Sequence, residues 1–185
     1  MKELSLNILD VAINSITAGA TTIRLAIVYL LQQNRLAISI EDDGCGMSQE
    51  ILQKVCDPFT TSRTTRKVGL GLPLFKQSAI TTGGNFDITS TQGVGTKVNA
   101  VFCTDNIDCM PMGDLTSTII TLLQHAPKVR WIVTYSVDDD KFDFDTNEVK
   151  AILGEVDIDS PQVLSFLSDY IKQNIKTINR GEEIL

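Results

Sequence analysis

The most specific structural signal in this sequence is Ile38-Ser39-Ile40-Glu41-Asp42-Asp43-Gly44-Cys45-Gly46-Met47. Its alternating apolar residues predict a strand that ends at Asp42, which places a carboxylate at the edge of a sheet. Gly44 and Gly46 follow, and their lack of side chains lets the backbone approach a flat ligand closely. An ordinary Asp-Gly turn is an alternative interpretation of the same residues, so their neighbours in the sequence must decide between the two.

On the N-terminal side, residues 2–17 predict a helix with two different faces. Apolar residues recur at helical spacing on one face, and a polar stripe at the same spacing holds Glu3, Asn7, Asp10 and Asn14. Asp10 and Asn14 form the motif Asp-x-x-x-Asn, one turn apart. We expect Glu3 and Asn7, which repeat this spacing, on the outer, solvated part of the helix.

On the C-terminal side, three segments continue the pattern. Residues 58–68 predict an irregular segment with a local basic cluster. Gly69-x-Gly71-Leu72 precedes a predicted helix with Pro73 in its first turn, where proline is tolerated. Gly93-x-Gly95-Thr96 forms a turn between two predicted strands, for which a plain hairpin is the alternative interpretation.

These four motifs, in this order, resemble the GHKL group of ATP-binding domains: gyrase-type topoisomerases, heat-shock chaperone ATPases, histidine kinases and MutL mismatch-repair ATPases. The resemblance covers residues 1–105 and is closest to stand-alone domains of the histidine-kinase type. It implies an α/β two-layer sandwich of the Bergerat type, with a mixed β-sheet and helices on one face. Residues 106–185 predict a linker and a small C-terminal α/β appendage, for whose role no motif gives an indication. Its predicted elements are strands over residues 129–137 and 141–144 and helices that begin after Asp114 and after Ser160.

The resemblance assigns the N-terminal polar stripe to ATP chemistry. Asn14 would be the Mg²⁺ ligand, because an amide oxygen binds the ion without adding negative charge beside the phosphates. Asp10 would be the catalytic residue, where hydrolytic members carry a Glu that orients and deprotonates the attacking water. Asp is one methylene shorter, and many histidine kinases carry an amide there, so general-base catalysis by Asp10 stays open.

The resemblance also implies how the nucleotide is recognised. Asp42, rather than Asp43, would accept a hydrogen bond from the adenine amine, where guanine carries an oxygen instead. Thr96 would bind this aspartate or its water, and residues 60–68 would form a lid whose charges meet the polyphosphate, unless they form a solvated basic loop. The cofactor-binding residues implied in this way are Asn14, Asp42, Gly44, Gly46, Met47, Arg63, Lys67, Gly69, Gly71, Leu72 and Thr96.

The composition of the chain also limits which functions are plausible. The net charge of −7 argues against a surface that binds nucleic acid over the whole protein. The sequence has no run of 18 apolar residues and no basic-then-apolar signal at its N-terminus, so we expect no membrane span and a cytoplasmic location. Four cysteines without a C-x-x-C pair, together with a single histidine, argue for reduced thiols and against a zinc site.

Three functions fit this pattern. The first is a Mg-dependent enzyme, either a regulatory ATPase or a kinase that phosphorylates a protein partner in trans. The second is a non-catalytic ATP-sensing switch that signals through the lid and the C-terminal module. The third is a scaffold that has lost nucleotide binding, against which Asp42 and Asn14 argue. Because the ATP-binding domain begins at Met1, we expect no phosphoacceptor domain before it, and we expect His125 to be a packed or surface residue.

Overall fold

The computed structural model describes residues 3–56 and 71–181. Its strands are β1 (Thr22–Leu30), β2 (Arg35–Asp42), β3 (Asn85–Thr91), β4 (Gly95–Cys103), β5 (Arg130–Val137) and β6 (Asp140–Asp145). Its helices are α1 (Leu4–Thr17), α2 (Gln49–Lys54), α3 (Gly71–Thr81), α4 (Leu115–His125), α5 (Thr146–Leu153) and α6 (Pro161–Ile178). The predicted order of helices and strands is thereby confirmed for the described residues.

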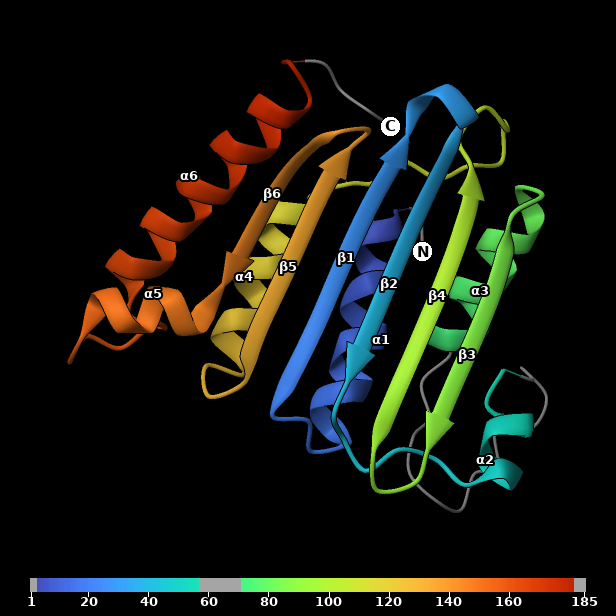
Figure 1. The fold of residues 1–185 in the computed structure, drawn as a ribbon, viewed down its shortest axis with the longest axis horizontal. Coiled ribbons are helices and arrows are strands. Elements are labelled where there is room, and N and C mark those ends of the chain that lie inside the picture. The colour runs from blue at the N-terminus through green and yellow to red at the C-terminus, as the bar shows by residue number, and fades with distance from the viewer. Residues whose placement is uncertain (1–2, 57–70, 182–185) are drawn as a thin grey trace.

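The strands form one mixed six-stranded sheet in the order β3-β4-β2-β1-β5-β6. Neighbouring strands are antiparallel except for β1 and β5, which run parallel. Helices α1, α3 and α4 lie behind the sheet in Figure 1, so they cover one face, while α6 packs against α4 and β6. The two-layer α/β sandwich with a mixed sheet, as the sequence predicted, is therefore confirmed.

The core lies between the sheet and these helices because the strands alternate in polarity. Along β1, the residues Ile23, Leu25, Ile27 and Tyr29 are at most 2 % exposed, and the residues between them face away from the helices. Helix α1 adds apolar side chains from the face predicted to be buried, among them Ile8. This packing presses α1 against the strands that carry the candidate site.

The C-terminal appendage is joined to the rest of the protein through the sheet itself. β5 pairs with β1 from Thr22 opposite Arg130 to Tyr29 opposite Val137, and β6 then extends the sheet by one edge strand. The predicted boundary at residues 105/106 falls in the loop between β4 and α4. Whether the two segments are separate domains stays a prediction.

Polar side chains cap three of the described helices, and a proline occupies the first turn of another. Ser48 and Asp114 accept hydrogen bonds from backbone N–H groups in the first turns of α2 and α4, and Asp145 does the same for α5. Ser160 precedes α6 as predicted, but its side chain makes no capping hydrogen bond. Pro161 supplies a pre-organised first turn, so this helix starts without the cap.

Candidate functional site

Asp42, at the end of β2, is tied to helix α1. Its Oδ2 accepts a hydrogen bond of 2.5 Å from the Ser15 hydroxyl, and its Oδ1 accepts one of 2.9 Å from the N–H of Gly44. An ionised carboxylate has about four acceptor positions, so each oxygen can still accept another hydrogen bond. The half-buried Asp42 is thus fixed in direction and still able to receive a donor from a ligand.

Ser15 is a residue of this site that the sequence did not identify. Its side chain is 4 % exposed, and the sequence pattern places it only among the residues of the buried helix face. The one available signal was a small hydroxyl next to Asn14 on a face that is otherwise apolar. Its partner is distant in the sequence, so the contact depends on how α1 packs on β2.

The glycines after Asp42 are required by close contacts with other motifs. A Cβ on Gly44 would lie 2.9 Å from the Cβ of Ala18, just beyond α1. Gly46 has a φ of 60°, and a Cβ there would overlap the carbonyl oxygen of Thr91 at the end of β3. The loop therefore fits between helix α1 and the hairpin that joins β3 and β4.

Ser90 connects this loop to that hairpin. The Met47 N–H donates to the Ser90 hydroxyl over 2.8 Å, and this hydroxyl in turn donates to the carbonyl of Gly95 over 3.0 Å. A hydroxyl has one proton, so Thr96, whose Oγ1 is 2.9 Å from Ser90 Oγ, must be the donor in that contact. Thr96 stands opposite Asp42 in the β2–β4 register, but its hydroxyl contacts Ser90 and not the carboxylate.

Both oxygens of the neighbouring Asp43 carboxylate accept hydrogen bonds from the start of β1. The donors are the N–H and hydroxyl of Thr21 and the N–H of Thr22, at 2.7 to 2.8 Å. Burial alone would raise the pKa of Asp43, but these hydrogen bonds outweigh it and hold the pKa below its usual range. Asp43 therefore fixes the start of β1, which favours Asp42 as the carboxylate that faces a ligand.

Asp10 lies against the second glycine motif. A Cβ on Gly71, the first described residue of α3, would lie 2.8 Å from the Cβ of Asp10 and 3.4 Å from its Oδ2. Because a helix N-terminus carries a partial positive charge, anionic groups are favoured at this position. Asn14 follows one turn later on α1, and the side chains of both residues are half-buried. Leu72 is 5 % exposed and belongs to the core.

Asn7 corrects one expectation from the sequence. It was expected on the solvated part of α1, but it is fully buried. Neither its amide nitrogen nor its amide oxygen has a hydrogen-bond partner among residues 3–56 and 71–181. The i, i+4 spacing predicts which residues share a face of α1, but this helix packs against α3, α4 and β2, and Asn7 is excluded from water.

The predicted lid at residues 60–68, with Arg63 and Lys67, and Gly69 of the second glycine motif lie outside the described residues. The geometry of the site therefore rests on α1, the end of β2, the β3–β4 hairpin and the start of α3. These elements bring together Asp10, Asn14, Asp42 and the glycines around them.

Comparison with known proteins decides the family. The family model described as "Histidine kinase-, DNA gyrase B-, and HSP90-like ATPase" matches residues 1–106. This chain belongs to that ATPase family. The matched region includes every described motif of the candidate site, and it ends where the loop between β4 and α4 begins.

Individual relatives agree with this family assignment. The signal transduction histidine-protein kinase AtoS of Escherichia coli is 35 % identical over 95 residues, which is 51 % of this chain and 15 % of AtoS. Sporulation kinase D of Bacillus subtilis is 32 % identical over 98 residues, 53 % of this chain and 19 % of that kinase. The chain thus spans less than a fifth of the length of these two curated relatives.

Solved structures support the fold of this ATPase family over a longer stretch. The Aquifex aeolicus MutL ATPase domain complexed with ADP has a TM-score of 0.50 at 14 % identity, covering 83 % of this chain and 69 % of that one. The N-terminal domain of a DNA repair protein has a TM-score of 0.54 at 12 % identity, covering 85 % and 59 %. These identities are low, so the likeness is one of fold.

One cavity adjoins the candidate site, because Asp42 and Thr96 are among its lining residues. It has a volume of about 530 Å³, and Arg24, Glu41 and Lys97 are among the residues that line it. These side chains alternate along their strands with the core residues, so they belong to the face of the sheet that the helices leave open.

Within the described ranges, no helix is long and apolar enough to span a membrane.

Proposed function

We propose that this protein binds ATP together with Mg²⁺ and uses it, either as a regulatory ATPase or as a kinase that phosphorylates a protein partner in trans. Membership in the ATPase family supports the nucleotide class, and the arrangement of Asp10, Asn14 and Asp42 supports the roles of single residues. The observation that carries the proposal is the contact between Asp10 and Gly71, which places a carboxylate beside the start of α3.

Asp42 would select adenine. Its carboxylate accepts from Ser15 and Gly44 and keeps further acceptor positions for the exocyclic amine of the base. Guanine presents a carbonyl oxygen at that position, which a carboxylate would repel. Gly46 and Met47, packed on the β3–β4 hairpin, would border the base because the loop runs directly from Asp42.

Asn14 would hold Mg²⁺. Among the described residues, no group of three or more His, Cys, Asp or Glu side chains could hold a metal ion by itself. A site with one amide oxygen suits Mg²⁺, which usually keeps several waters and takes its other ligands from phosphate oxygens. Bound there, the ion would neutralise phosphate charge, while the N-terminus of α3 would attract the phosphates from the other side.

Asp10 would act on the group that attacks the terminal phosphate. One helical turn separates it from Asn14, so it would stand beside the phosphates without holding the metal itself. It would orient a water, or an acceptor hydroxyl or imidazole of a partner, and would take its proton.

The test is turnover by Asp10→Asn, which keeps the shape of the side chain and removes the base. If Asp10 is a general base, hydrolysis or transfer should fall by roughly 10²–10⁴-fold while nucleotide affinity stays the same. Glu3→Gln is the matched control, since it neutralises a carboxylate seven residues earlier, at the N-cap of α1. Normal turnover by Asp10→Asn would remove Asp10 from the chemistry.

The alternative function is a switch that binds ATP without turnover. One observation favours it: polar contacts connect the end of β2 with the C-terminal segment. Asp43 binds Thr21, the Thr21 carbonyl accepts from the N–H of Arg130 at 2.8 Å, and the Arg130 side chain binds Asp145 at the start of α5. Wild-type protein that binds ATP but shows no turnover with any partner would select this alternative.

We further propose that the protein acts in the cytoplasm on protein partners and not on nucleic acid. The net charge of −7 supports the second point. All four cysteines are free thiols, as expected in a reducing compartment.

A further inference from the structure

Strand β6 and helices α5 and α6 enclose a groove with a volume of about 480 Å³. Its walls are mostly apolar and include Phe144, Leu167 and three large side chains that remain in water. Ile152 on α5 is 87 % exposed, and Phe166 and Tyr170 on α6 are 67 % and 43 % exposed. Large apolar side chains that gather on one surface mark an interaction site more often than single ones do.

The aromatic wall of the groove is already organised. Phe166 stacks on Tyr170 with ring planes 11° apart and centroids at 6.3 Å, and Tyr170 meets Phe142 edge-on at 5.7 Å. These rings have few rotatable bonds, so a ligand that packs on them loses little side-chain entropy. The aromatic wall is therefore an ordered surface on which a ligand can pack.

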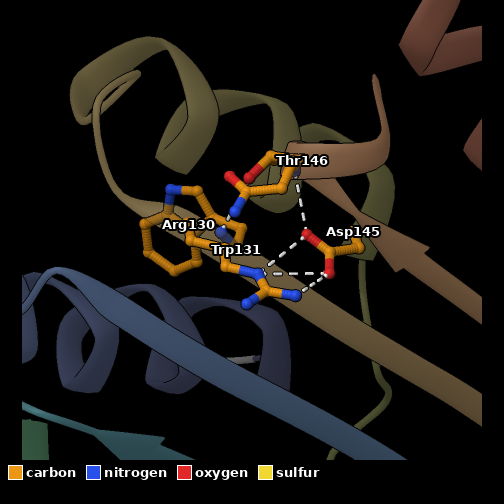
Figure 2. A network of polar contacts seen from close by, with 5 residues as sticks. Arg130, Trp131, Asp145 and Thr146 are labelled. Carbon is orange, nitrogen blue, oxygen red and sulfur yellow. Dashed lines mark hydrogen bonds and ion pairs between the residues drawn. The ribbon is translucent and has the colours of Figure 1, made fainter. Parts of the chain in front are cut away.

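The opposite wall is fixed by an ion pair at the start of α5. Figure 2 shows the guanidinium of Arg130 directed at the carboxylate of Asp145, with Nη2 2.6 Å from Oδ2. The same carboxylate accepts from the N–H of Asn147, and the Thr146 hydroxyl accepts from the N–H of Trp131. These contacts anchor α5 to β5, so we expect the groove to change little on binding.

The charge of the segment that builds the groove identifies the class of partner. Residues 142–170 contain seven acidic residues and one basic residue, a net charge of −6, whereas the whole chain has −7. Asp143, Asp145 and Glu148 line the groove, and no basic residue lines it in the described part of the chain. Asp143 and Asp145 have ion-pair partners, but the described residues provide none for Glu148.

We propose that this groove binds an amphipathic helix of a partner protein, with aliphatic residues on one face and Lys or Arg on both flanks. The aliphatic face would pack on Ile152, Phe166 and Tyr170, and the basic flanks would meet the acidic rim. A second copy of this chain is a poor occupant, because it would bring a net charge of −6 against the same charge. The inference does not depend on ATP turnover.

The test is fluorescence anisotropy with the full chain and a labelled helical peptide. The peptide carries leucines at positions i, i+3, i+4 and i+7 and lysines on both flanks, and a paired peptide carries glutamate in place of every lysine. The lysine peptide should bind, more tightly at low salt, and the glutamate peptide should not. No binding of the lysine peptide, or equal binding of both, would overturn the proposal.

Variants separate groove binding from general attraction to an acidic protein. Phe166→Ser and Ile152→Ser change exposed side chains, so both should fold, and each should weaken binding of the lysine peptide about tenfold or more. Ile80→Ser on α3, where the side chain is 47 % exposed, is the matched control and should bind like the wild type. Unchanged affinity in Phe166→Ser, or a dimer that this substitution dissociates, would contradict the proposal.

Discussion

Asn7 is a fully buried residue of α1 whose side-chain amide has no hydrogen-bond partner among the described residues. Leaving such a group unsatisfied costs about 1–3 kcal/mol, so Asn7→Leu, which is similar in size, should raise the free energy of unfolding by about 1 kcal/mol or more. Urea denaturation measures this change. Asn7→Asp is the control and should lower stability, because it buries a charge. A loss of stability in Asn7→Leu would mean that the amide has a partner, such as a buried water.

At the scale of residues, the sequence predicts the features that depend on a local sequence pattern. It places Asp42 at a strand end and Asp10 and Asn14 one turn apart on a helix, and the structure has all three at those positions. It misses Ser15 and Ser90, because their partners are 27 and 43 residues away along the chain. Such contacts depend on which elements pack together, and periodicity carries no information about that.

In the β3–β4 hairpin, Gly93 and Gly95 of the last motif differ in the reason why each position favours glycine. A Cβ on Gly95 would overlap the carbonyl oxygen of Asp42, whereas Gly93 has a φ of 79° and open space around it. Gly93→Ala should therefore cost about 1–2 kcal/mol of backbone strain. Gly95→Ala should cost at least about 1 kcal/mol more and weaken nucleotide binding, because it displaces Asp42. Equal melting temperatures and affinities for the two variants would contradict this account of the hairpin.

Helix α5 should lose support at acidic pH. The hydrogen bond from Arg130 is the main cause that holds the pKa of Asp145 below its usual range, and the N–H of Asn147 adds to it. A carboxyl whose pKa is lower in the folded state stabilises the fold above its unfolded pKa of about 4 and loses this contribution as pH falls further. Urea unfolding of the wild type and Asp145→Asn should therefore differ at neutral pH, and the difference should shrink as pH falls below about 4. A difference that does not change with pH would remove the ion pair from the explanation.

At the scale of the whole molecule, the C-terminal segment completes the sheet. The sequence predicts strands over residues 129–137 and 141–144, and β5 and β6 confirm them. It does not predict that β5 pairs with β1, because a parallel pair joins segments far apart in the chain. Tertiary packing determines which strand pairs with β5, because the sequence of a single strand is compatible with several pairings.

This arrangement predicts that residues 1–105 do not form a stable unit by themselves. Removal of residues 106–185 would leave β1 without its partner β5 and would uncover the side of α1 that packs on α4. An unpaired apolar strand edge promotes aggregation. Size-exclusion chromatography and circular dichroism of residues 1–105 should therefore show aggregated or partly unfolded protein. A monomer with the thermal stability of the full chain would support two separate domains instead.

We propose that Asp42 recognises adenine at this site, and isothermal titration with ATP and GTP can test this claim. The wild type should bind ATP in the presence of Mg²⁺ and discriminate against GTP. Asp42→Ala should weaken ATP binding by about 1–3 kcal/mol, and Asp43→Ala, checked for folding by its thermal melt, should keep the wild-type preference. Equal affinities of the wild type for ATP and GTP, or loss of the preference in Asp43→Ala alone, would contradict the claim.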